Sequence, residues 1–280
     1  MKRLLLLLSW LPVLAWAQPT SATADFDFAL YLVGSGFKED AATLLRHYRP
    51  DGDSISFVKG YVLYSNHQLD SAVHYLSSVG SQSQLFAEAR FYGALSAAHD
   101  NRYHDAAQLL QPLRQTDDPA VRNLYHFEQA GIGLLQRDLR CFDSCYALLQ
   151  PDDFRIASEA AALAQLRAGL PHKNKSPWVA AGLSAVVPGL GKVYAGRPGE
   201  GVSAFLIVGS LMAATAENAY KEGWTNWKTL LFGSLSTVFY LGNIYGSAVS
   251  VRVGMDDRNN QTDVQILYHI HIPLRNSYRR

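Results

Sequence analysis

HQLDSAVHYL, residues 67–76, carries the pattern that decides the fold of the first half of the chain. Related segments stand on either side of it: GFKEDAATLL at residues 36–45 and NRYHDAAQLL at residues 101–110. Each has a central alanine, and these alanines lie 31 and 34 residues apart. A single helix pair cannot bury its apolar face alone, so repetition at this period predicts helical hairpins that stack on one another. The repeated alanines are Ala41, Ala72 and Ala106.

A second small residue lies twelve positions before each repeat alanine, where a partner helix would approach closely. A weaker fourth copy, QRDLRCFDSCYALL at residues 136–149, has Phe142 at the alanine position. Over residues 25–165 the pattern resembles the tetratricopeptide repeat. The resemblance implies a curved all-α solenoid whose concave face binds a peptide or protein segment; a helical spacer without a ligand is the alternative. The upstream small residues are Ala29, Gly60, Ala94 and Ala130.

The first 17 residues predict a secretory signal peptide. Lys2 and Arg3 precede an apolar run at residues 4–14, and a small-residue cleavage site follows at residues 15–17. A retained N-terminal anchor is the alternative, although the apolar run is short for a membrane span. After cleavage, residues 18–170 form the predicted exported domain of helical repeats.

The two halves that follow the signal peptide carry opposite net charges. Residues 18–170 contain 12 Lys and Arg against 18 Asp and Glu, a net charge of −6. Residues 171–280 contain 11 against 6, a net charge of +5. This asymmetry predicts two different tasks. The exported half has no basic stripe, which argues against a nucleic-acid partner.

The exported half has no recognisable catalytic or metal-binding motif. Its histidines are scattered, its acidic pairs stand beside prolines as helix-start or turn residues, and it contains no phosphate-binding loop. Cys141 and Cys145, the two cysteines, lie in a C-x-x-x-C spacing that is neither a thioredoxin-like pair nor a zinc site. A local disulfide and two free, buried thiols are both open. We expect no cofactor and no metal.

The second half is predicted to enter a membrane. A polar linker at residues 171–177 leads to three charge-free apolar stretches at residues 176–191, 201–216 and 229–251. The third stretch has the length of about 20 residues that a helix needs to cross the hydrocarbon core. The first two are shorter and require snorkelling ends or local thinning. Residues 178–255 are therefore predicted to be a membrane domain, with a soluble helical core as the alternative.

Small residues form a stripe with a four-residue spacing in the third apolar stretch: Gly242, Gly246 and Ser250. Within lipid, such a stripe allows helix backbones to approach closely, since apolar burial alone no longer drives association. The stripe predicts helix packing, either within the chain or between copies, and we favour packing within the chain.

PGLGKVYAGRPGEG, residues 188–201, joins the first two apolar stretches. It lacks the spacing of a P-loop and of a Rossmann fingerprint, so it does not predict a nucleotide site. It is similar instead to a family of small bacterial membrane domains with the signature P-G-x-G-x-x-Y-x-G-R. That resemblance implies a membrane-embedded helical hairpin with no known chemistry. The matching residues are Pro188, Gly189, Gly191, Tyr194, Gly196, Arg197 and Gly201, and Lys192 adds a second charge to the turn.

The charges of this turn predict its side of the membrane. By the positive-inside rule, Lys192 and Arg197 lie in the cytoplasm, the repeats lie in the periplasm, and the third stretch returns the chain to the cytoplasm. The C-terminal tail, residues 256–280, would then be cytoplasmic. Apolar and polar residues alternate over residues 264–272, which predicts a short strand with His269 and His271 on one face.

Together these features predict a non-enzymatic, membrane-anchored protein of the bacterial cell envelope, held in the inner membrane. Its periplasmic repeats would bind a protein partner as a scaffold or as an accessory factor of assembly or secretion, and its membrane domain would contact lipids. The alternative is a membrane-embedded sensor, or a lipid- or small-molecule-binding protein, that the repeats regulate. An enzyme acting on lipid-linked substrates would have only Lys192, Tyr194 and Arg197 as candidate residues.

Overall fold

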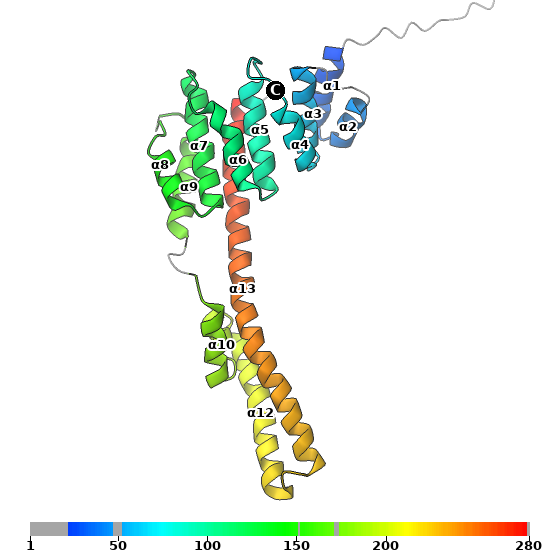
Figure 1. Ribbon diagram of the computed structural model, residues 1–280, viewed down its shortest axis with the longest axis vertical. Helices are drawn as coiled ribbons and strands as arrows, with labels where there is room; N and C mark the ends of the chain where they lie inside the picture. The colour runs from blue at the N-terminus through cyan, green and yellow to red at the C-terminus, as the bar shows by residue number, and fades with distance from the viewer. Residues whose placement is uncertain (1–21, 47–51, 151, 171–173, 279–280) are drawn as a thin grey trace, which may run out of the picture. The chain divides into compact units, whose positions relative to one another are not determined.

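The computed structural model describes residues 22–46, 52–150, 152–170 and 174–278. Within these residues every regular element is a helix, which confirms the predicted all-α class. The predicted signal peptide lies outside the described residues. The chain divides into two compact units (Figure 1). Unit 1 contains the described residues up to Ile156 and those from His271 onward, and unit 2 is Ala157–Ile270.

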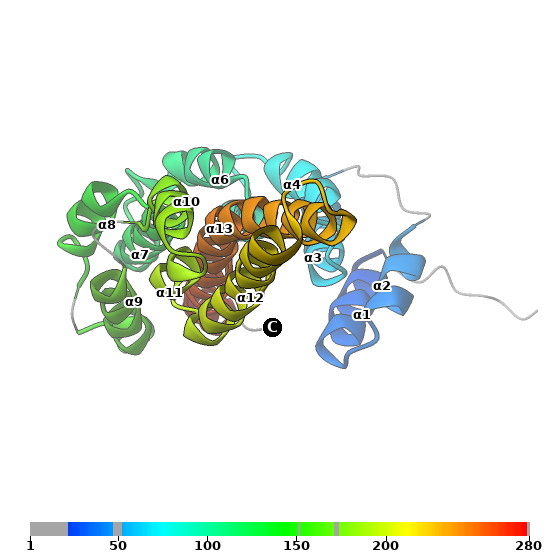
Figure 2. The same cartoon turned by 90° about the horizontal axis from the view of Figure 1, so that it is seen from below.

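Unit 1 is a series of helix pairs, each joined by a short turn and packed on the next pair. Figure 2 shows the pairs following one another along an arc. Its helices are α1 (Ala22–Gly34), α2 (Lys38–Leu45), α3 (Asp53–Ser65), α4 (Leu69–Ser77), α5 (Phe86–His99), α6 (Tyr103–Leu110), η1 (Gln111–Leu113), α7 (Pro119–Leu135) and α8 (Leu139–Tyr146).

The small residues of the repeat pattern lie where these helices are closest. All six repeat-pattern alanines are 0% exposed. A Cβ atom on Gly60 would come within 2.5 Å of Leu76 Cγ, so α3 and α4 can be this close only with glycine at that position. In the fourth pair Phe142 takes the alanine's place and is 3% exposed. Small side chains at the contact points therefore set how closely each pair packs.

The four turns between paired helices have the same hydrogen-bond pattern. In the second turn His67 N–H donates to the Tyr64 carbonyl at 3.0 Å, and Gln68 N–H donates to the Leu63 carbonyl at 2.9 Å. These two bonds define a Schellman motif, which requires a left-handed residue after the helix end. That residue has a φ of 89°, 59°, 61° or 60° in the four turns, in the order Gly36, His67, Asn101 and Arg137.

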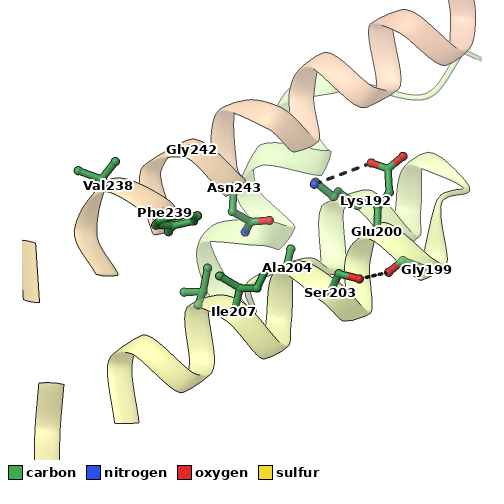
Figure 3. Close-up of a pocket in the computed structure, with 11 residues that line it drawn as sticks. Lys192, Gly199, Glu200, Ser203, Ala204, Ile207, Val238, Phe239, Gly242 and Asn243 are labelled. Carbon is green, nitrogen blue, oxygen red and sulfur yellow. Dashed lines mark hydrogen bonds and ion pairs between the residues drawn. The ribbon is translucent and has the colours of Figure 1, made fainter. Parts of the chain in front are cut away.

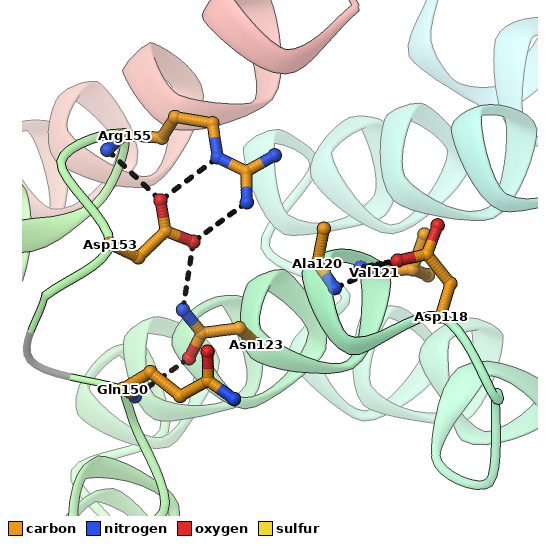
Figure 4. A network of polar contacts seen from close by, with 7 residues as sticks. All are labelled: Asp118, Ala120, Val121, Asn123, Gln150, Asp153 and Arg155. Atoms are coloured by element: carbon orange, nitrogen blue, oxygen red, sulfur yellow. Dashed lines mark hydrogen bonds and ion pairs between the residues drawn. The ribbon is translucent and has the colours of Figure 1, made fainter.

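A polar network joins the start of α7 to the loop after α8 (Figure 4). Asp118 caps α7 by accepting the Ala120 N–H at 2.8 Å, as its position before Pro119 predicts. The Asp153 carboxylate accepts two hydrogen bonds from the Arg155 guanidinium, at 2.9 and 2.8 Å, and one from Asn123 Nδ2 at 2.9 Å. The Arg155 hydrogen bonds, opposed by desolvation and aided by Asn123, lower the pKa of Asp153 to about 2.

Asp153→Asn is predicted to lower the free energy of unfolding at pH 7 by about 1 kcal/mol, because it weakens charge-assisted hydrogen bonds. In the wild type the pKa of Asp153 is depressed from 3.8 to about 2 in the folded state. Its contribution is therefore complete above about pH 4 and is lost as the pH falls through about 2. Urea midpoints of the full chain in detergent, measured between pH 2 and 7, test this. The exposed neighbour Asp152 serves as control: Asp152→Asn should keep the wild-type dependence of the urea midpoint on pH. The same pH dependence in the wild type and both variants would contradict the prediction.

Unit 2 contains helices of very different lengths. Its members are α9 (Ala157–Gly169), α10 (Pro177–Val186), α11 (Leu190–Ala195), α12 (Pro198–Glu222) and α13 (Trp227–Ser277), of which α13 continues into unit 1 from His271 onward.

Only one helix among the described residues, α12, is long and apolar enough to cross a membrane. It has 25 residues, and only 11% of its most apolar window is buried. At about 1.5 Å per residue, α12 is about 37 Å long, whereas the 10-residue α10 reaches only about 15 Å. The first predicted membrane stretch is therefore too short to span, because Pro188 follows directly on the end of this helix. The three predicted spans reduce to one that meets both criteria.

The predicted C-terminal strand is wrong, because residues 256–277 are helical and belong to α13. Some apolar residues of this segment are also four positions apart, and those are the residues that the structure buries. Ile266, Ile270 and Leu274 are 0% exposed, while Val264 and Tyr268 are 66% and 63% exposed. One buried stripe with one exposed face is the signature of a helix. The two histidines belong to different units: His269 Nδ1 lies 2.6 Å from Glu159 Oε2 in unit 2, and His271 is part of unit 1.

The end of α13 packs within unit 1. Tyr64 Oη and His271 Nδ1 are 2.9 Å apart, and the rings of Phe91 and Tyr278 have centroids 6.2 Å apart. Leu274 lies between these contacts along the chain and is fully buried. The tail and the helical repeats therefore share one compact unit, so they lie on the same side of any membrane. The prediction that the tail faces the opposite compartment from the repeats is wrong.

Candidate functional site

The glycine-rich turn at residues 188–201 brings α10, α11 and α12 together through close backbone contacts. Gly189 has a φ of +86°, and a Cβ atom there would collide with the Gly201 carbonyl oxygen. A Cβ atom on Gly201 would in turn lie 2.6 Å from Val193 Cγ2. Val187, before Pro188, is extended, with φ −131° and ψ 115°, as a residue before proline prefers. Gly189 and Gly201 therefore serve backbone packing.

Gly191 is fixed against α10 by a chain of hydrogen bonds. Its N–H donates to Ser184 Oγ at 3.0 Å, and Ser184 Oγ lies 2.7 Å from Ser247 Oγ. Ser247 Oγ donates to the Asn243 carbonyl at 2.8 Å, so Ser184 supplies the proton between the two hydroxyls. Both serines are 0% exposed. A Cβ atom on Gly191 would collide with the Ala180 carbonyl oxygen, so α10 and α11 meet at this glycine, and Ser184 connects them to α13.

Tyr194 and Gly196 complete the turn. Tyr194 Oη accepts the Ser176 N–H at 3.2 Å, and its carbonyl accepts from Lys175 Nζ at 2.8 Å. Gly196 has a φ of +95°, and Arg197 N–H donates to the Lys192 carbonyl at 2.9 Å, which ends α11 in a Schellman motif. The tyrosine of the signature thus ties the turn to the chain before α10.

The two basic residues of the turn share one acidic partner. Arg197 Nη1 lies 3.3 Å from Glu200 Oε1, and Lys192 Nζ lies 3.8 Å from Glu200 Oε2. Two cations beside one carboxylate leave this corner with a formal charge of +1. The local potential therefore favours an anion.

A cavity of about 690 Å³ lies between α12 and α13 next to this corner (Figure 3). Lys192 and Glu200 line its charged end, and Ile207 and Phe239 line its apolar end. The Asn243 side chain points into the cavity between the two ends. Asn243 is 7% exposed, and among the described residues neither Oδ1 nor Nδ2 of its amide has a hydrogen-bond partner. The arrangement has the form of a small-molecule site: an apolar cleft with a few convergent polar groups.

Sequence reasoning missed Asn243. It is the one amide side chain in the apolar stretch at residues 229–251, and a strongly polar residue inside such a stretch is a signal for function. The predicted stripe of small residues includes the adjacent Gly242 but not Asn243 itself. Nothing described lies within 4 Å of a Cβ atom built on Gly242 or Gly246, so packing of these glycines within the chain is not found. Ser250 is buried and donates to the Gly246 carbonyl at 2.8 Å.

The two cysteines of unit 1 are free thiols in the structure, so the disulfide considered for Cys141 and Cys145 is not formed. Both side chains are partly buried on α8, and a hydrogen bond joins the two thiols. Burial, together with Cys145, raises the pKa of Cys141 to about 11. A thiol with a raised pKa is a weak nucleophile and a weak metal ligand.

A second polar cluster lies in unit 1 beside the end of α13. The rings of His99 and His271 have centroids 6.2 and 6.1 Å from the ring of Tyr64. Burial, reinforced by His271, lowers the pKa of His99. Glu128 is 1% exposed, and burial raises its pKa well above the ordinary value. Among the described residues no group of three or more His, Cys, Asp or Glu could hold a metal ion.

Comparison with known proteins identifies no matching family model, curated protein or solved structure. The resemblance to tetratricopeptide repeats and to the membrane-hairpin family therefore stays a prediction from the sequence.

Gly191→Ala is predicted to lower the stability of unit 2 by about 2 kcal/mol or more, because the new methyl group meets a backbone carbonyl that cannot move aside. Thermal unfolding of the detergent-solubilised full chain measures the effect. Gly182→Ala is the matched control, since nothing described lies within 4 Å of a Cβ atom there. That variant lies in the interior of α10 and should be neutral or more stable by up to about 1 kcal/mol. Equal unfolding temperatures for the two variants would contradict the packing role of Gly191.

Proposed function

We propose that this protein is a non-enzymatic, membrane-anchored component of the bacterial cell envelope whose helical repeats bind a protein partner. The observation that carries the proposal is the uncovered apolar surface of α12, of which only 11% is buried in the most apolar window. A monomeric soluble protein rarely leaves so large a continuous apolar face exposed. Insertion into a bilayer removes that face from water.

The proposed anchor is a hairpin of α12, the one described helix that meets both criteria for a span, with the first half of α13, which is long enough but less apolar. Residues 229–251 of α13 are free of charged side chains, and exposed aromatic residues surround the loop between the helices. Tyr220, Trp224 and Trp227 are 94%, 76% and 67% exposed, which suits a membrane interface. Two crossings return the chain to its starting side, in agreement with the packing of residues 271–278 in unit 1. In this proposal α10 and α11 lie at the interface on that side.

The proposed orientation follows the predicted signal peptide. Export of the N-terminus puts unit 1 and the tail in the periplasm, with the hairpin loop in the cytoplasm and the protein in the inner membrane. This orientation differs from the one that the positive-inside rule assigned to Lys192 and Arg197, because the hairpin turns at residues 223–226 and not at the glycine-rich segment.

Labelling in spheroplasts tests the anchor and its orientation. In a background that lacks Cys141 and Cys145, we expect Gln82→Cys and Asn276→Cys to react with a membrane-impermeant maleimide. Thr225→Cys, in the hairpin loop, should react only after permeabilisation, since a bilayer excludes the charged reagent. If only Thr225→Cys is labelled in intact spheroplasts, the protein has the opposite orientation to the one proposed. Opposite results for Gln82→Cys and Asn276→Cys would exclude a two-crossing hairpin, and recovery in the soluble fraction would exclude the anchor.

Partner binding is proposed for unit 1. The unit already holds one helical segment, the end of α13, against α3 and α5. It also exposes a stacked aromatic pair on α1: Phe28 and Tyr31 are 52% and 67% exposed, and their ring centroids are 6.3 Å apart. Clustered exposed aromatics are typical of protein-binding surfaces.

A photo-crosslinking residue placed at position 32, next to this pair, tests the partner proposal in membranes. We expect one specific protein adduct, which the double variant Phe28→Ser/Tyr31→Ser reduces about tenfold or more, as for an aromatic hot spot. Phe154→Ser is the control, because Phe154 is 87% exposed elsewhere in unit 1 and should leave the adduct unchanged. An adduct that survives the double variant would place binding elsewhere, and no specific adduct from any exposed position of unit 1 would contradict the proposed function.

The second candidate function is a membrane-embedded sensor or lipid-binding protein that the repeats regulate. One observation favours it: the cavity of unit 2 holds a buried amide without a hydrogen-bond partner among the described residues.

A further inference from the structure

We infer that the cavity between α12 and α13 binds an anionic amphiphile, with its headgroup at Lys192 and Asn243 and its acyl chain along Ile207 and Phe239. The inference rests on the proposed membrane location of α12, since that location supplies the ligand. It is independent of whether unit 1 binds a protein.

The Asn243 amide is the first argument for a ligand. A buried polar group without a hydrogen bond costs about 1–3 kcal/mol. Among the described residues, neither the donor nor the acceptor of this side chain has a partner. Its neighbours on α13 differ: Ser247 and Ser250 each donate to a carbonyl one turn earlier. Since Asn243 points into the cavity, a ligand there can accept from Nδ2 and donate to Oδ1 (Figure 3). A phosphodiester or carboxylate oxygen meets the first requirement, and a hydroxyl group meets the second.

The charge at the charged end of the cavity is the second argument. Glu200 lies 3.8 Å from Lys192 and 3.3 Å from Arg197, so one carboxylate faces two cations. The Lys192 side chain is only 22% exposed, and its distance from Glu200 is at the limit of an ion pair. An anion that approaches Lys192 gains a charge-assisted hydrogen bond without having to break a short one. This selects an anionic headgroup over a zwitterionic one.

The shape and lining of the cavity are the third argument. Beyond Asn243 the walls are apolar, formed by Ala204, Ile207, Val208 and Phe239. The volume of about 690 Å³ suits part of an amphiphile and not a second helix. Ile207 and Phe239 are also 49% and 45% exposed, so the apolar end opens toward the surroundings of the hairpin. One acyl chain can enter from the bilayer while the remainder of a lipid stays outside.

A phospholipid and a free fatty acid both present an acyl chain with an anionic head, and binding experiments separate them. The full chain, purified in a neutral detergent, is titrated with phosphatidylglycerol, oleate or phosphatidylcholine, and bound lipid is counted by native mass spectrometry. We expect one molecule of phosphatidylglycerol or oleate per chain at concentrations where phosphatidylcholine is not retained. The preferred anionic ligand then identifies the source. Equal retention of phosphatidylcholine would overturn the inference.

Asn243→Leu is the diagnostic variant. It removes the unpartnered amide, so we expect an unchanged or raised unfolding temperature without lipid and a loss of anionic-lipid affinity of about tenfold. Asn218→Leu is the matched control: Asn218 lies on α12 outside the cavity and donates to the Ala214 carbonyl at 2.8 Å, so its loss should leave lipid affinity unchanged. Wild-type affinity in Asn243→Leu would overturn the inference.

Ala204→Trp is a second variant that keeps every polar group and fills the cavity. We expect it to abolish retention of the lipid while the protein still enters the membrane fraction. Unchanged retention would show that the lipid binds elsewhere. Failure of the wild type to enter membranes would contradict the proposed anchor, whereas membrane insertion without a retained anionic lipid would contradict this inference alone.

Discussion

The close approach of helix backbones is the constraint on which both units depend. In unit 1 it occurs at Gly60, where the Leu76 side chain occupies the space of a Cβ atom. In unit 2 it occurs at Gly191, which lies against the Ala180 carbonyl. Helices this close gain dispersion contacts along their length, and they lose them at once when a methyl group forces the backbones apart. The small residues are therefore the fixed points around which larger side chains pack.

Close packing in unit 2 also positions α13, which forms one wall of the cavity. The hydrogen-bond chain from Gly191 through Ser184 to Ser247 joins α11, α10 and α13 on one side of α13. Asn243 lies one turn before Ser247, and its carbonyl closes that chain while its amide faces the cavity. The backbone carbonyl of Asn243 thus takes part in helix packing, while its side-chain amide is available to the proposed ligand. Such a pre-formed site binds its ligand without first being ordered.

Much of the fold could be predicted from the sequence, and the failures have physical causes. The period of the small residues predicted the paired helices of residues 22–146, because spacing along a helix decides which side chains meet. The alternation of Val264, Ile266 and Tyr268 with polar residues predicts a strand over residues 264–272. The same segment also has apolar residues four apart, and burial of Ile266 and Ile270 settled the helical alternative. Two periods fit one short segment, and only its neighbours decide between them.

By itself, the sequence determined the all-α class, the close approach of the paired repeat helices at small residues and the architectural role of the glycines at residues 188–201. These depend on local geometry: a residue without a β-carbon permits conformations and approaches that others do not. Tertiary structure alone decided that the tail packs in unit 1 and that Asn243 faces a cavity without a hydrogen-bond partner among the described residues. Each of these depends on which distant segments meet, and burial and hydrogen bonding are properties of that meeting.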